Sequence, residues 1–106
     1  MTNYTSGRRY EYKIMDSLKG YYSIRTAGSH SKFDVIAFRL DAEEGALIRT
    51  IQSKSGKKPV ISKAELKELQ YLRKMLPSIV SVELWLWTKG ISEPEIKILT
   101  KGKTYE

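Results

Sequence analysis

The chain has 106 residues, with 19 Lys and Arg against 12 Asp and Glu, a net charge of +7 and an apolar share of 41%. This length predicts one domain, over residues 1–106, with a single modest core. The absence of cysteine excludes disulfides and thiolate metal sites, the single histidine excludes a zinc site of several histidines, and no apolar run could cross a bilayer or serve as a signal peptide.

The first half of the chain predicts a helix and then a β-meander. The stretch RRYEYKIMDSLK follows Ser6-Gly7 and ends at Gly20, a suitable C-cap, and its apolar residues recur at helical spacing. Residues 21–27, 33–40 and 46–54 are rich in β-forming residues and predict three strands. The polar segments GSHSK and DAEEG separate these strands.

The second half predicts another helix and two further strands. Ser62 and Glu65 form an S-x-x-E capping box ahead of AELKELQYLRKM, which Pro77 ends. VSVELWLW at 80–87 is apolar on both faces, as in an interior strand, and EIKILT at 95–100 is a final short strand. The order α-β-β-β-α-β-β predicts a mixed central sheet flanked by helices, of class α/β or α+β. The predicted core stripe of the second helix is Leu66, Leu69, Leu72 and Met75.

Charge is unevenly distributed along the chain. Residues 1–32 carry a net charge of +4, 33–52 carry −2, 53–75 carry +5 and 76–106 are neutral. Two basic blocks around an acidic middle favour a surface that binds a polyanion such as nucleic acid, with an acidic pocket in it. A lysine-rich surface that serves only solubility is the alternative.

Three polar placements interrupt the apolar patterns. Glu11 lies on the helix face of Ile14 and Leu18, where a carboxylate needs compensation by a cation or metal. The alternative is that Glu11 lies at the edge of the apolar stripe and pairs with Arg8.

The other two placements are on strands. Asp34 shares a strand face with Ile36 and Phe38, which looks like the buried face; the alternative is that Asp34 is a residue of the turn before the strand. The third placement is the pair Gln52 and Lys54 on one face of the third strand, where a solvated strand end is the alternative.

These side chains can converge at one edge of the sheet. Oxygen ligands with a lysine, and without histidine or cysteine, suit Mg²⁺ or Mn²⁺ rather than zinc. A divalent ion and a lysine within a basic surface are the requirements for phosphodiester hydrolysis. The sequence therefore predicts a metal-dependent nuclease site.

The order GRRYEYKIM, G-YYSIRTAGS-HSKFDVIAF and IQSKSGK resembles the PD-(D/E)XK nuclease superfamily, and within it the archaeal Holliday junction resolvases, over roughly residues 6–90. The resemblance implies a restriction-endonuclease-like core and an enzyme that cuts four-way DNA junctions. It also implies that Asp34, Gln52 and the backbone carbonyl of Ser53 hold Mg²⁺ or Mn²⁺, with Glu11 as a further carboxylate. Lys54 would orient the attacking water, and Ser29 would touch the substrate near the scissile bond.

DNA contacts are expected from the two basic blocks, and a two-fold symmetric junction implies a homodimer located with the nucleoid in the cytoplasm. Trp85 and Trp87 offer aromatic surface for such a dimer, unless they belong to an ordinary core strand. No membrane partner or small organic cofactor is expected. The residues predicted to contact DNA are Arg8, Arg9, Arg25, His30, Lys32, Lys57 and Lys58.

The chain departs from the family pattern at Gln52, where the family usually has glutamate. Loss of one negative charge weakens the metal site, although a carboxamide oxygen can still ligate Mg²⁺. Two alternatives therefore stay open: a related nuclease acting on other branched, nicked or foreign DNA, and a weakly active or non-catalytic DNA-binding relative. The end of the chain at Glu106 further predicts that no longer tail takes part in dimerisation.

Overall fold

The computed structural model describes residues 3–26, 33–41 and 45–100, and it contains the predicted order of two helices and five strands. In the described part of the chain, neither helix is long and apolar enough to cross a membrane. The elements are α1 (Asn3–Ser17), β1 (Tyr22–Arg25), β2 (Val35–Asp41), β3 (Gly45–Gly56), α2 (Lys63–Met75), β4 (Val80–Thr88) and β5 (Glu95–Leu99).

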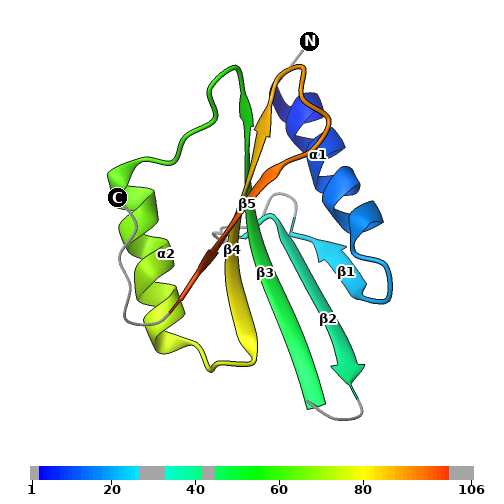
Figure 1. Cartoon of the computed structure of the whole chain (residues 1–106), viewed down its shortest axis with the longest axis vertical. Helices are drawn as coiled ribbons and strands as arrows, with labels where there is room; N and C mark the ends of the chain where they lie inside the picture. Colours follow the sequence, from blue (N-terminus) through cyan, green and yellow to red (C-terminus); the bar gives the residue numbers. More distant parts are fainter. Residues whose placement is uncertain (1–2, 27–32, 42–44, 101–106) are drawn as a thin grey trace.

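The five strands form one mixed sheet in the order β1-β2-β3-β4-β5. All neighbouring pairs are antiparallel except β3 and β4, which are parallel because α2 carries the chain from the end of β3 back to the start of β4. Helices α1 and α2 lie on opposite faces of the sheet (Figure 1). The prediction of a mixed sheet with flanking helices is confirmed, and the fold is α+β.

Helix α1 covers one face of the sheet with an apolar stripe. Ile14 is fully buried and Leu18 nearly so, in a cluster that includes Trp85 and Trp87 of β4. Gly20 adopts a left-handed φ of 88°, as expected of the residue that ends the helical run. The expectation that the two tryptophans offer dimer surface is wrong, because α1 covers them and each is only 3% exposed.

Helix α2 packs on the other face, over β4 and β5. Its capping box is present as predicted: the backbone N–H of Glu65 donates to Ser62 Oγ, and the Glu65 side chain accepts from the backbone N–H of Ser62. Leu69 is fully buried, but the predicted core position Met75 is exposed. The buried stripe continues through Arg73 instead, so position 75 turns away from the sheet.

The faces of β2 are the reverse of the sequence expectation. Val35 and Ala37 are fully buried beneath α1, whereas Ile36 is half-buried and Phe38 is exposed. Asp34 precedes the strand on the side of Ile36 and Phe38, which is therefore the more open face. The reason is that α2 packs mainly over β4 and β5, so that among the described residues of this face of β2 only Ile36 packs against the α2 cluster, while Phe38 and Leu40 are exposed.

Candidate metal and nucleic-acid site

Backbone hydrogen bonds hold Asp34 against the end of β3. The Asp34 N–H donates to the carbonyl of Ile51 at 2.8 Å, and the N–H of Ser53 donates to Asp34 Oδ2 at 2.8 Å. The carboxylate is thereby fixed beside the strand segment that carries Gln52 and Lys54. Its position is set by the β2–β3 pairing rather than by a flexible side-chain contact.

Opposing influences act on the Asp34 carboxyl group, and together they raise its pKa above the ordinary aspartate value. Burial raises the pKa most, and the hydrogen bond from the Ser53 N–H lowers it. The negative charges of Glu11 and Glu65 raise it further, while the positive charge of Lys54 lowers it. Charged side chains from α1, β3 and α2 therefore all influence the pKa of this one carboxyl group.

Glu11 projects from α1 toward β1. Its Oε1 forms an ion pair with Arg25 Nε at 2.9 Å, and both side chains are 17% exposed. A second nitrogen of Arg25 donates to Tyr12 Oη at 3.2 Å. The compensating cation for Glu11 is thus Arg25, and the side chain of Arg8, considered as the alternative partner, lies outside the described part of the chain.

Gln52 and Lys54 meet a common acceptor on α2. Lys54 Nζ lies 2.6 Å from Glu65 Oε2, and Gln52 Nε2 donates to the same oxygen at 3.3 Å. Gln52 is only 8% exposed, and its other polar atom, Oε1, is buried without a hydrogen-bond partner. A buried acceptor without a partner loses the hydrogen bonds that it makes to water in the unfolded chain.

Glu65 belongs to this group although the sequence indicated only a capping role for it. The hydrogen bond from Lys54 lowers the pKa of Glu65 most; burial raises it, and bonds from Ser62 lower it again, so the carboxyl is ionised at neutral pH. A short connection from the end of β3 to the start of α2 is the sequence signal that could have placed Glu65 beside Lys54.

The donors at this end of β3 suit a hard divalent cation. Oxygens are available from Asp34, from the unpartnered Gln52 Oε1 and from the backbone of Ser53, and the charge of Glu11 acts on Asp34. Mg²⁺ and Mn²⁺ prefer carboxylate, carbonyl and water oxygens. No group of three or more histidine, aspartate or glutamate side chains suited to a metal is found among the described residues.

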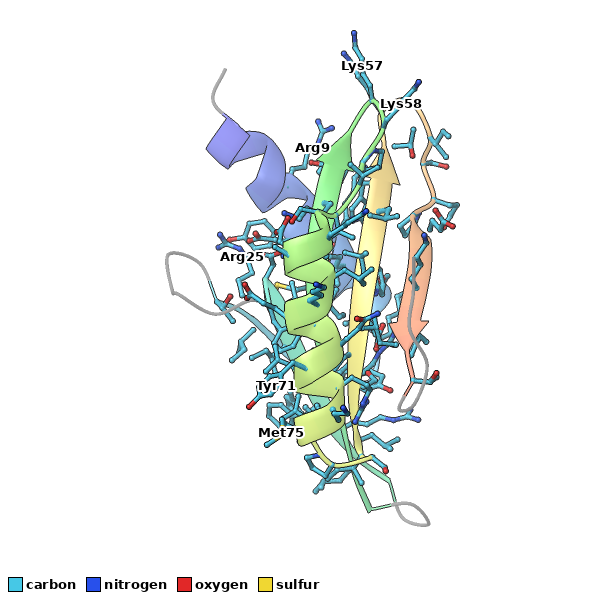
Figure 2. The ribbon with its side chains drawn as sticks, turned by 90° about the vertical axis from the view of Figure 1, so that its left-hand side faces the viewer. Arg9, Arg25, Lys57, Lys58, Tyr71 and Met75 are labelled. Carbon is cyan, nitrogen blue, oxygen red and sulfur yellow. The ribbon has the colours of Figure 1, made fainter. Side chains whose placement is uncertain are left out.

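Basic side chains lie around this end of the molecule. Arg9, Lys57 and Lys58 are exposed, and Figure 2 shows them toward the end of β3, with Arg25 on the side of α2 that is turned away from β5. The guanidinium of Arg25 is engaged by Glu11, so it offers less free charge than the lysines. Ser29, His30 and Lys32, also predicted for this site, lie outside the described residues.

Comparison with known proteins adds no family assignment: no family model matches the chain, and no curated protein matches it.

Proposed function

We propose that the chain is a metal-dependent endodeoxyribonuclease with a restriction-endonuclease-like core that resolves four-way DNA junctions by phosphodiester hydrolysis. The observation that carries the proposal is the position of the Asp34 carboxylate. It is tied to β3 by the Ser53 amide, lies under the influence of Glu11 and Lys54, and neighbours a strand residue with a buried, unpartnered oxygen, Gln52.

Each oxygen donor has a part in holding the metal. Asp34, Gln52 Oε1 and the Ser53 carbonyl would hold the ion, and Glu11 would add a carboxylate directly or through a water molecule. When bound, a divalent ion polarises the scissile phosphate and lowers the pKa of its water. A bound ion would give the Gln52 Oε1 atom the partner that it lacks in the protein alone.

Lys54 is the positive group beside these donors. Its ammonium orients the attacking water and offsets negative charge that develops on the phosphate. Glu65 holds the ammonium at the edge of the site, because a carboxylate 2.6 Å away restricts an otherwise flexible side chain. Glu65 is therefore a positioning residue in this mechanism.

DNA binding follows from the exposed cations. Arg9, Lys57 and Lys58 contact phosphates, so they fix the position of the DNA and do not read bases. Recognition by shape suits a branched substrate. Two opposed strands must be cut in a four-way junction, so the enzyme acts as a homodimer with one site in each subunit.

The test is cleavage of an end-labelled four-way junction with Mg²⁺ or Mn²⁺. We expect paired symmetric incisions that Asp34→Ala abolishes and that Lys54→Met slows by about a hundredfold or more. Asp16→Ala, which removes an exposed carboxylate from α1, is the matched control and should cut at the normal rate.

Two other results would favour the alternative functions. Equal cutting of nicked, flapped and junction DNA would identify a nuclease with a broader substrate range. Tight junction binding without cleavage in either metal would identify a non-catalytic DNA-binding relative.

A further inference from the structure

The hairpin of β1 and β2 presents an apolar face that, among the described residues, α2 covers only at Ile36. Ile36, Phe38 and Leu40 alternate along β2 on this face, and Tyr22 and Ile24 stand opposite Phe38 and Ile36 on β1. Tyr22 and Phe38 stack with ring centroids 5.6 Å apart, and the Leu40 side chain is 86% exposed. A solvated face of an antiparallel sheet ordinarily carries polar residues. A hairpin that is apolar on both faces needs a second layer.

Helix α2 borders this face with apolar side chains of its own. Tyr71 and Met75 are exposed by 62% and 63%. Figure 2 shows both on the flank of α2 that is turned away from β5, which is the side on which β1 and β2 lie in the strand order. We call the exposed flank of α2 with Tyr71 and Met75 the ridge, and the exposed apolar face of the β1–β2 hairpin beside it the shelf. We call this surface the apolar step; its exposed members are Tyr22, Ile24, Phe38, Leu40, Tyr71 and Met75.

The apolar step is large enough for a stable interface. With about 200 Å² for a large side chain, the exposed fractions of its six members amount to roughly 770 Å². Contiguous apolar patches on monomeric proteins seldom exceed about 600 Å². Each partner of a stable interface of standard size buries about 800 Å². The exposed area is therefore close to what one subunit of a dimer contributes.

We propose that the apolar step is the surface through which two copies of this chain associate around a two-fold axis. In an isologous contact the same patch serves both partners, so it must be complementary to itself. A ridge beside a shelf meets this condition, because the α2 ridge of each copy can rest on the β1–β2 shelf of the other. An unrelated partner that filled only the shelf would leave Tyr71 and Met75 of the ridge in water.

The test is the mass of the protein in solution, measured by sedimentation equilibrium between 1 and about 100 µM. We expect twice the 12.2 kDa of the chain for the unmodified protein. Leu40→Asp on the shelf and Tyr71→Asp on the ridge should each raise the dissociation constant at least tenfold, because each buries an unpaired charge in the interface. Ile91→Asp, an equally drastic change at an exposed residue in the β4–β5 turn, should leave the mass unchanged.

The emission of the buried Trp85 and Trp87 reports whether each variant is folded. If an aspartate variant fails to fold, the milder Leu40→Ser or Tyr71→Ser decides in its place. A monomeric unmodified protein, or a folded shelf or ridge variant with an unchanged dissociation constant, would overturn the proposal. It supplies the interface for the homodimer of the proposed function, but the measurement needs neither DNA nor metal. A dimer that cuts no DNA would support this interface and contradict only the proposed nuclease activity.

Discussion

Glu65 accepts hydrogen bonds from three residues with its two carboxylate oxygens. Oε1 accepts from Ser62 at the start of α2, and Oε2 accepts from Gln52 and Lys54 at the end of β3. The sequence predicted the pairing of Gln52 with Lys54, because alternate residues of a strand share a face. It did not predict the second role of Glu65, because the capping motif already accounted for that carboxylate and the distance to Lys54 depends on the path of the connecting loop.

The proximity of Gln52 and Glu65 predicts the effect of a glutamate at position 52. In Gln52→Glu a second carboxylate meets Glu65 Oε2, so a hydrogen bond becomes a repulsion between like charges. We expect the metal-free variant to be less stable by about 1–3 kcal/mol, as for a buried group that loses its partner. Mg²⁺ should recover this loss and keep or raise cleavage. Urea denaturation in EDTA and in Mg²⁺ measures the effect.

The double variant Gln52→Glu/Glu65→Gln is the control for this prediction. It returns one carboxylate and one carboxamide to the pair, so the metal-free stability should return to that of the unmodified protein. Equal stability of Gln52→Glu and the unmodified protein in EDTA, with no gain from Mg²⁺, would remove Gln52 from the proposed ligands.

Among the helices and strands, local sequence signals predicted an element correctly where the tertiary packing agrees with them. The capping box of α2, Gly20 after α1 and the doubly apolar β4 all lie where the sequence predicted them. The exposure of Met75 and the open face of β2 could not be predicted in the same way. Both depend on which strands α2 covers, and helical periodicity alone does not contain that information.

An ion pair joins β3 and β4, and sequence periodicity does not predict it, because the pairing depends on which strands lie side by side. Arg49 donates to both carboxylate oxygens of Glu83 at 2.8 Å, and Glu83 is 1% exposed. Burial raises the pKa of Glu83, but bonds from Arg49, Ser81 and Trp85 outweigh it and leave the pKa lowered. This ion pair places the charged Glu83 side chain inside the protein, on a strand that the sequence predicted to be apolar on both faces.

Arg49→Met should therefore destabilise the fold by about 3 kcal/mol at pH 7, because it leaves the Glu83 charge buried without its cation. In the unmodified protein the lowered pKa of Glu83 stabilises the fold above the unfolded value of about 4.3, and this contribution is lost as pH falls. Loss of Arg49 removes the main lowering influence, so the deficit should grow as pH rises through that value. Urea denaturation from pH 3 to pH 7 measures it.

The double variant Arg49→Met/Glu83→Gln separates the charge from the packing. It should recover part of the loss at pH 7, and because it has no carboxyl at position 83, its own free energy of unfolding should lack the Glu83 contribution that the unmodified protein gains as pH rises. A deficit of Arg49→Met that is the same at pH 3 and pH 7 would show that the arginine acts through packing alone.

For the whole molecule, the charge blocks and the apolar surfaces differ in how far the sequence predicted them. The two basic blocks place exposed cations on α1 and after β3. The sequence assigned surplus aromatic surface to Trp85 and Trp87, which α1 buries, and missed Tyr22 and Tyr71, which are exposed. Sequence periodicity marks apolar residues, but the tertiary packing of a helix decides which of them remain in contact with water.

The distribution of cations predicts how salt acts on DNA binding. Each phosphate neutralised by a lysine releases counterions, so the logarithm of the affinity falls with the logarithm of the salt concentration in proportion to the number of contacts. Lys57→Ala/Lys58→Ala should reduce this slope by about 2 and weaken binding to every sequence alike. Fluorescence anisotropy with a labelled junction from 50 to about 300 mM salt measures the slope.

Lys97→Ala provides the control, because this exposed lysine lies on β5, at the edge of the sheet opposite β1. It removes positive charge but no phosphate contact in the proposed complex, so the slope should not change. If both variants reduced the slope by the same amount per charge, the net charge of +7 rather than a localised surface would govern binding. DNA would then have no preferred path past Lys54, and junction cleavage at the end of β3 would lose its electrostatic basis.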